Sequence, residues 1–109
     1  MPVITATFDP AVDVSPADAE RFNARVAGLC LDQLSAAPDK VQILMVRAIA
    51  PVHGASIYIG VQYRHQDFRS PGVMDGFMQA LDHLCMELFG KTPRIRCFPS
   101  RNDQLFARN

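Results

Sequence analysis

Two stretches of this sequence share one form: SPADAERF at residues 15–22 and SPGVMDGF at residues 70–77. In each, a serine precedes a proline, as at many helix N-termini, and a phenylalanine follows six residues after that proline. Shifting the chain by 55 positions, from Ser15 to Ser70, superimposes the two stretches without a gap. The same shift pairs Ile4 with Ile59, Leu29 with Leu84, Cys30 with Cys85 and Pro38 with Pro93. This persistence through strand, loop and helix indicates an internal duplication.

The first half reads as a strand, a helix and a second strand. Residues 3–8 are short, rich in β-branched side chains and stop at Asp9-Pro10, so they predict a strand. An apolar stripe at i, i+4 spacing predicts an amphipathic helix from residue 15 to about residue 37. The members of this stripe are Phe22, Val26, Cys30 and Leu34. Residues 41–49 are almost continuously apolar, which is typical of a strand covered on both faces.

The second half repeats this order. Residues 57–64 alternate apolar and polar side chains, the period of a strand with unlike faces. Residues 70–90 predict the second helix, which ends at Gly90. Its apolar stripe consists of Val73, Phe77, Leu81, Leu84, Cys85 and Leu88. Residues 94–98 predict a brief strand, and the polar tail 99–109 carries Leu105 and Phe106, which we expect to dock on the rest of the chain.

The elements predict one α/β (α+β) domain over residues 1–109, with half-repeats at about 2–49 and 56–98 and a tail at 99–109. A four-stranded sheet would carry both helices on one face. Two arrangements of this βαββαβ order remain open: each βαβ half pairs its own strands in parallel, or the halves interleave as a ferredoxin-like split βαβ. The continuous apolar run at residues 41–49 favours the parallel version.

Composition limits the function classes. The 109 residues are 49% hydrophobic and 20% charged, as in a globular domain. The formal net charge of +0 provides no field that would attract nucleic acid or an anionic membrane surface. We find no signal peptide and no apolar run of membrane-spanning length, and therefore expect a cytoplasmic protein. A chain this small leaves much surface uncovered, which favours association with copies of itself.

The cysteines and histidines predict no metal site and no cofactor. They are Cys30, Cys85, Cys97, His53, His65 and His83. None has the spacing of a zinc site or a redox motif, so we expect reduced thiols. Cys30 and Cys85 fall on apolar helix faces, where packing is the expected role.

Met1-Pro2 opening directly into the first strand, the repeated βαβ unit and the chain length together resemble the tautomerase superfamily. Within it, the chain is most similar to the long members with fused repeats, such as 5-carboxymethyl-2-hydroxymuconate isomerase and macrophage migration inhibitory factor. The resemblance spans nearly the whole chain. It implies a homotrimer with sites at subunit boundaries, in which Pro2 becomes the catalytic N-terminal residue once Met1 is removed.

Arginines form the rest of the site that the resemblance implies. Arg69-Ser70 resembles an Arg-Ser pair with which several members bind a substrate carboxylate. Arg96 resembles the arginine that the short 4-oxalocrotonate-type members carry in the strand after their helix. Arg64 is a further candidate for the same anion. The tail from Arg101 to Phe106 resembles the Asn-containing ending of the isomerase. A guanidinium can bind both a carboxylate and a developing dienolate through paired hydrogen bonds.

The expected activity is the movement of a proton within a small unsaturated 2-oxo or 2-hydroxy carboxylic acid. An α-amino group titrates near pH 8, and burial or nearby cations favour its neutral form, so Pro2 could act as general base and then acid. With Met1 retained, the Pro2 nitrogen is an amide without a basic lone pair. Two alternatives stay open: a decarboxylase or hydratase on the same scaffold, and a non-catalytic binding or assembly module of the same or a ferredoxin-like fold.

Overall fold

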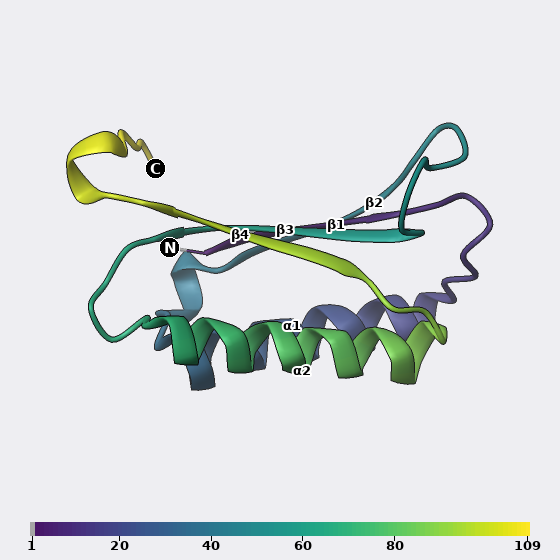
Figure 1. Ribbon diagram of the computed structural model, residues 1–109, viewed down its shortest axis with the longest axis horizontal. Helices are drawn as coiled ribbons and strands as arrows, with labels where there is room; N and C mark the ends of the chain where they lie inside the picture. The colour runs from purple at the N-terminus through teal and green to yellow at the C-terminus, as the bar shows by residue number, and fades with distance from the viewer. Residues whose placement is uncertain (1) are drawn as a thin grey trace.

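The computed structural model describes residues 2–109 as a sheet with two helices packed on one face (Figure 1). Met1, and with it the expectation that Met1 is removed, lies outside the described residues. The strands are β1 (Val3–Phe8), β2 (Gln42–Arg47), β3 (Ile57–Arg64) and β4 (Arg94–Ser100), and the helices are α1 (Pro16–Leu34) and α2 (Pro71–Phe89). Short 3-10 turns at Pro38–Lys40 and Asn102–Gln104 follow α1 and β4. None of the helices in this range is long and apolar enough to cross a membrane.

Strand pairing decides between the two expected arrangements. The order in the sheet is β2-β1-β3-β4, so β1 lies between β2 and β3. β1 pairs with β2 in parallel, β3 pairs with β4 in parallel, and β1 meets β3 antiparallel. Each half therefore pairs its own two strands, and the halves join side by side. The parallel version is confirmed, and the ferredoxin-like alternative is wrong because it would not place β1 next to β2.

Both helices begin where the repeated Ser-Pro pairs predict. The Ser15 hydroxyl accepts a hydrogen bond from the Asp18 amide at 3.1 Å, and the Ser70 hydroxyl accepts one from the Val73 amide at 3.3 Å. These bonds satisfy amides that have no partner within the first helical turn. Each helix is 19 residues long. α1 ends before the expected residue 37, because Ser35 takes a left-handed conformation with φ 53°.

The predicted apolar stripes form the core between the helices and the sheet. The α1 stripe is completely buried: Phe22, Val26, Cys30 and Leu34 are each 0% exposed. The α2 stripe is buried in its centre and half-buried at its ends. An aromatic cluster of Phe8, Phe22 and Phe89 closes one end of the core, with ring centroids 5.1–6.0 Å apart. Cys30 and Cys85 are buried free thiols, which confirms the expected packing role.

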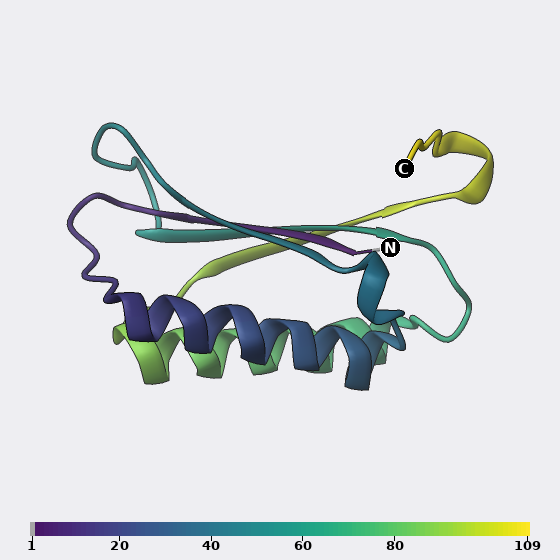
Figure 2. The same cartoon turned by 180° about the vertical axis from the view of Figure 1, so that it is seen from behind.

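The sheet has a second face that no helix covers (Figure 2). The expectation that residues 41–49 form a strand covered on both faces is wrong for the single chain, because β2 lies at the edge of the sheet. On the open face, Leu44 and Val46 remain 43% and 45% exposed. Ile49 lies beyond the end of β2 and is fully exposed. An apolar run predicts burial, but it does not say which surface provides the cover.

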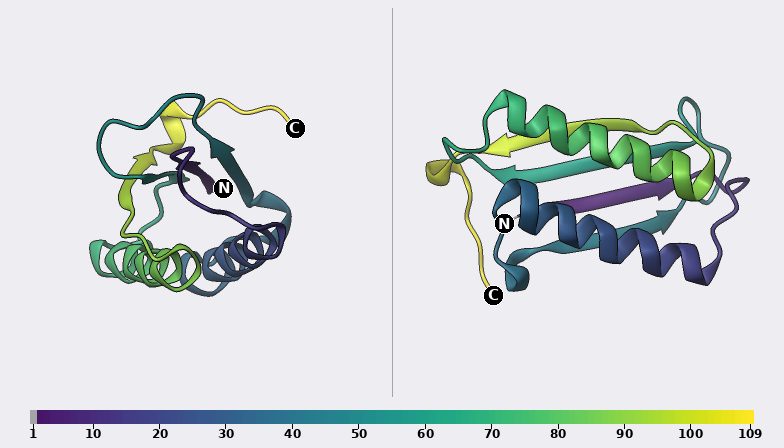
Figure 3. Two further views of the ribbon diagram at one scale, coloured as in Figure 1. Left: turned by 90° about the vertical axis from the view of Figure 1, so that its right-hand side faces the viewer. Right: turned by 90° about the horizontal axis from the view of Figure 1, so that it is seen from below.

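The two chain ends lie at the same end of the molecule (Figure 3). β1 starts there, α1 ends there, and the tail after β4 curves back past the N-terminal end of the sheet. The expected docking of this tail is wrong for Phe106, which is 92% exposed, whereas Leu105 is half-buried. β4 also extends to Ser100, two residues further than predicted.

Candidate functional site

Pro2 lies directly before β1, at the end of the sheet where both termini meet. Its carbonyl accepts a hydrogen bond from the Gln42 amide at 3.1 Å, which continues the pairing with β2. Val3 is opposite Gln62 in β3, so the next residue along β3, Tyr63, flanks Pro2. Side chains alternate along a strand, so Pro2 points to the same side as Ile4, which faces the helices. Pro2 is completely buried. The first residue of the proposed mature chain thus belongs to the helix-facing side.

Arg69 belongs to the same end and is held firmly. It lies in the turn between β3 and α2 and is only 7% exposed. Its Nε donates to the Leu34 carbonyl at 2.9 Å, and its Nη1 donates to the Arg64 carbonyl at 2.8 Å. The guanidinium also lies 5.2 Å from the ring centre of Phe68, within cation–π range. Arg69 therefore joins the last turn of α1 to the end of β3.

A pocket of about 440 Å³ opens between α2 and β4 and is lined in part by Arg69. Its other lining residues are Tyr63, His65, Pro71, Met74, Met78, Ile95, Arg96 and Cys97. The walls are mostly apolar, and the two arginines add fixed positive charges. This combination suits a small organic anion with an apolar body.

Two of the predicted arginines, Arg69 and Arg96, line the pocket, and Arg64 does not. Arg96 pairs with Gly60 and therefore leaves β4 on the open-face side, so it reaches the pocket from the edge of the sheet. Arg96 is exposed on the edge strand β4, where its Nη1 donates to the Ile95 carbonyl at 2.8 Å. Arg64, by alternation along β3, points to the open face and does not line the pocket. Its Nε is buried without a hydrogen-bond partner among residues 2–109. Pro2 does not line the pocket either; it lies on the other side of Tyr63.

The sequence reasoning missed Tyr63 as a site residue. Tyr63 is the last buried side chain of β3, and alternation alone places it on the helix-facing side, next to the turn that holds Arg69. Burial, helped by Cys97, raises the pKa of Tyr63, while Arg69 opposes that rise. The phenol therefore stays protonated at neutral pH and is a hydrogen-bond donor. His65 also lines the pocket. Its position directly after β3, next to the turn that holds Arg69, is the signal that indicates this.

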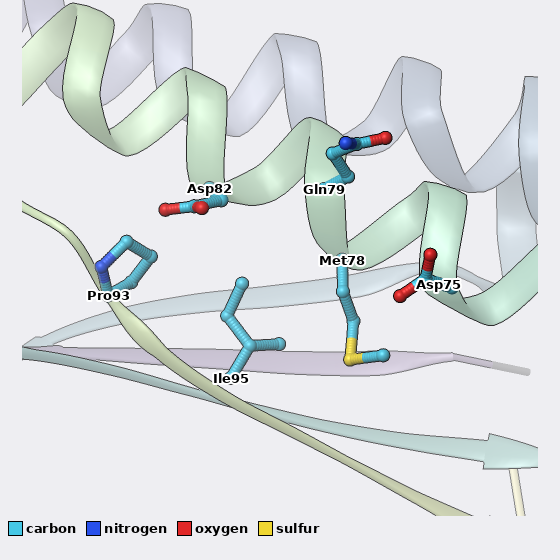
Figure 4. A pocket seen from close by; sticks show the side chains of 6 residues that line it. All are labelled: Asp75, Met78, Gln79, Asp82, Pro93 and Ile95. Carbon is cyan, nitrogen blue, oxygen red and sulfur yellow. The ribbon is translucent and has the colours of Figure 1, made fainter.

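A second groove follows the same edge of the molecule, and its charge is opposite (Figure 4). Asp75 and Asp82 extend from α2 at the two ends of the groove, and Met78 points from the helix toward Ile95 on β4. No cationic side chain of the described part of the chain lines it. Two carboxylates would repel an anionic ligand, so the Arg69 pocket is the better candidate for one.

Comparison with solved structures identifies the fold. A macrophage migration inhibitory factor-like protein from Entamoeba histolytica superimposes with a TM-score of 0.76 at 9% identity, covering 98% of this chain and 95% of that one. The fused 4-OT wild-type symmetric trimer gives 0.76 at 12% identity, covering 98% and 92%. Pt0534 inactivated by 2-oxo-3-pentynoate gives 0.78 at 12% identity, covering 94% and 89%. The chain therefore shares the fold of these three proteins.

The similarity to known proteins is one of structure and not of sequence. No family model matches the sequence, and no curated protein matches it significantly. The three similar structures are covered almost completely, so the likeness includes both βαβ halves. The expected resemblance to fused-repeat members is thereby confirmed at the level of fold.

Proposed function

We propose that the protein is an isomerase that moves a proton within a small unsaturated 2-oxo or 2-hydroxy carboxylic acid, with Pro2 as the general base and acid. The observation that carries this proposal is the position of Pro2 as the residue before β1 in a tautomerase fold, at the end that also holds Arg69. Removal of Met1 would convert the Pro2 nitrogen from an amide to a secondary amine.

The burial of Pro2 suits this role. An amine in a poorly solvated place disfavours its charged form, which lowers its pKa and leaves a neutral base at physiological pH. The amine takes the proton from the 2-hydroxyl of a dienoic acid and returns it to a carbon of the same substrate, so no co-reactant is needed. The rigid ring fixes the direction of the lone pair, which favours transfer along one path.

Arg96 is the proposed ligand of the substrate carboxylate. It is the exposed arginine of the pocket, so its guanidinium can exchange water for an anion at little structural cost. Because β4 is an edge strand, an arginine there is also well placed to reach a site on an adjacent subunit. Arg64 remains a candidate on the open face.

We further propose a homotrimer that covers the open face of the sheet. This face exposes four large apolar side chains, which are Leu44, Val46, Tyr58 and Phe98. The fused 4-OT structure of the same fold is a symmetric trimer. Association of this kind would provide the cover that the apolar sequence of β2 predicts.

Val46→Lys is expected to break this assembly, because it places a charge among the exposed apolar side chains of the open face. Light scattering should give the wild type a molecular mass of three 12.1 kDa subunits and the variant the mass of one subunit. Leu31→Lys is the matched control, since Leu31 is 38% exposed on α1 and should leave the trimer intact. A wild-type chain that is already monomeric contradicts the assembly proposal.

Two measurements on the unmodified protein test the activity. Intact mass first shows whether Met1 is absent. The mature protein is then given 2-hydroxymuconate or phenylenolpyruvate, and separately 2-oxo-3-pentynoate, the compound that inactivates the structurally similar Pt0534. We expect turnover, and we expect the Pro2 nitrogen to form a bond to the alkyne carbon far from the ketone while the neighbouring carbon takes up a proton. Peptide mass mapping should place one whole inactivator on Pro2.

A full-length mass with Met1 retained, or a free Pro2 amine without any turnover of either enol acid, would contradict the proposal. The non-catalytic binding or assembly module would then be the better description. The hydrogen bonds of Arg69 to two backbone carbonyls favour that second candidate, because they show that one predicted ligand also has a structural role.

A further inference from the structure

The two pocket arginines differ so much in their surroundings that they cannot serve the same purpose. Arg96 is exposed, and within residues 2–109 its only hydrogen bond goes to the neighbouring Ile95 carbonyl. Arg69 is buried, bonded to the carbonyls of Leu34 and Arg64, and packed on Phe68. A substrate carboxylate would have to compete with these contacts for the Arg69 guanidinium.

We infer that Arg69 is a positioning residue, whose guanidinium, fixed by the carbonyls of Leu34 and Arg64, keeps the Pro2 amine neutral by its charge instead of binding the substrate. The inference rests on the proposed function, because it needs Pro2 as the base. It assigns separate tasks to the two arginines: Arg69 prepares the base, and Arg96 holds the anion.

The geometry places the Arg69 charge close to Pro2. Tyr63 flanks Pro2 across the β1–β3 pairing, and Tyr63 and Arg69 line the same pocket. Leu34, which accepts the Nε hydrogen bond, ends the helix that covers this end of the sheet. One strand spacing of about 5 Å plus the reach of a side chain gives a separation of roughly 10 Å. At an effective dielectric constant near 20, a positive charge at this separation lowers the pKa of the amine by about one pH unit.

The other ionisable groups at this end cannot replace Arg69 in this role. They are Cys30 on α1, Tyr63 on β3, His65 in the following turn, Arg64 at the end of β3, and Asp39 and Lys40 in the turn before β2. Burial raises the pKa of the Cys30 thiol to about 11 and also raises that of Tyr63, so both are uncharged at neutral pH. Arg64 leaves β3 on the open face, away from the helix-facing side to which Pro2 belongs. Asp39 and Lys40 are exposed and carry opposite charges, and the exposed Arg101 and Asp103 of the tail pair with each other. Burial lowers the pKa of Arg69, and the nearby Cys30 and Tyr63 partly offset this effect. Arg69 nevertheless stays charged at neutral pH, because a guanidinium is a very weak acid.

The test is a direct titration of the Pro2 nitrogen by nitrogen-15 NMR in the mature protein. Arg69→Gln removes the charge but keeps an amide donor for the carbonyls. We expect it to raise the Pro2 pKa by about one pH unit, the size that the estimated charge interaction predicts. Arg69→Lys keeps the charge and should stay close to the wild-type value. In kinetics, Arg69→Gln should shift the rise of kcat/KM to higher pH. Arg96→Gln should raise KM but leave the pH of that rise unchanged.

Arg47→Gln is the matched control. Arg47 also holds backbone carbonyls, those of Asp9, Pro10 and Val12 at 3.0–3.4 Å, but it lies opposite Phe8 at the far end of β1. Its loss should leave the Pro2 pKa unchanged. If Arg69→Gln does not fold, His65→Glu replaces it, because it adds a negative charge to the same pocket through a side chain that is 55% exposed. It should raise the Pro2 pKa.

The outcomes are distinguishable. An unchanged Pro2 pKa in Arg69→Gln or, where that variant does not fold, in His65→Glu overturns the inference while leaving the proposed function intact. An equal change in Arg47→Gln overturns it as well, because the effect would then be general. A Pro2 nitrogen that does not titrate as an amine overturns the proposed function, and this inference with it.

Discussion

The mature Pro2→Ala variant is expected to lose about 10²–10⁴-fold in kcat/KM toward an enol acid, the contribution typical of a general acid–base group. Alanine still offers an α-amine, but it lacks the ring that directs the lone pair and fills the buried space before β1. The more solvated, mobile amine should also titrate at higher pH. Initial rates measured over a pH series, with intact mass verifying the N-terminus of both proteins, give the comparison.

Thr7→Ser is a suitable control for this experiment, because Thr7 lies on the open face of β1, the strand that Pro2 precedes, and at its far end. Its kcat/KM should stay within about two-fold of the wild type. Equal activity of wild type and Pro2→Ala would show that the amine takes no part in proton transfer. An equal loss in both variants would instead indicate general damage to β1.

The helices were predictable because their signals are local. The Ser-Pro pairs and the i, i+4 stripes lie within one element each, and the structure confirms them at Ser15 and Ser70. Strand order was open, because pairing depends on contacts between distant segments such as Ile4 with Ile43 and with Val61. The prediction that β2 is covered on both faces was wrong for the same reason. Hydrophobicity indicates that Leu44 and Val46 should be buried, but it does not show which surface covers them.

The sequence indicates some residues of the candidate site, but neither Tyr63 nor the contacts of Arg69. A Pro2 next to a predicted strand and an arginine before a predicted helix are visible in the sequence. That Arg69 would hold the Leu34 carbonyl, 35 residues away, depends on how α1 packs over the turn after β3. Tyr63 joined the site through the same packing. Because of these tertiary contacts, Arg69, which the sequence suggests as a ligand, instead hydrogen-bonds to the backbone of its neighbours.

The largest expected stability effect is that of Phe22→Ala. Phe22 is 0% exposed and its ring lies 6.0 Å from that of Phe8 and 5.8 Å from that of Phe89. Truncation removes this aromatic packing and leaves a cavity between α1 and the sheet. We expect the free energy of unfolding to fall by about 3–5 kcal/mol, measured by urea denaturation at a fixed subunit concentration.

Phe77→Ala separates the two contributions to that loss. Phe77 holds the position that the 55-residue repeat pairs with Phe22, and it is also 0% exposed, but it has no aromatic contact among the described residues. Phe77→Ala should lower the free energy of unfolding less than Phe22→Ala does. The difference should be roughly 0.5–1.5 kcal/mol, which is what an aromatic pair contributes beyond burial. Phe106→Ala, at a side chain 92% exposed, should change stability by less than about 0.5 kcal/mol. If Phe77→Ala costs as much as Phe22→Ala, burial alone stabilises both halves, and the aromatic cluster adds nothing to the first.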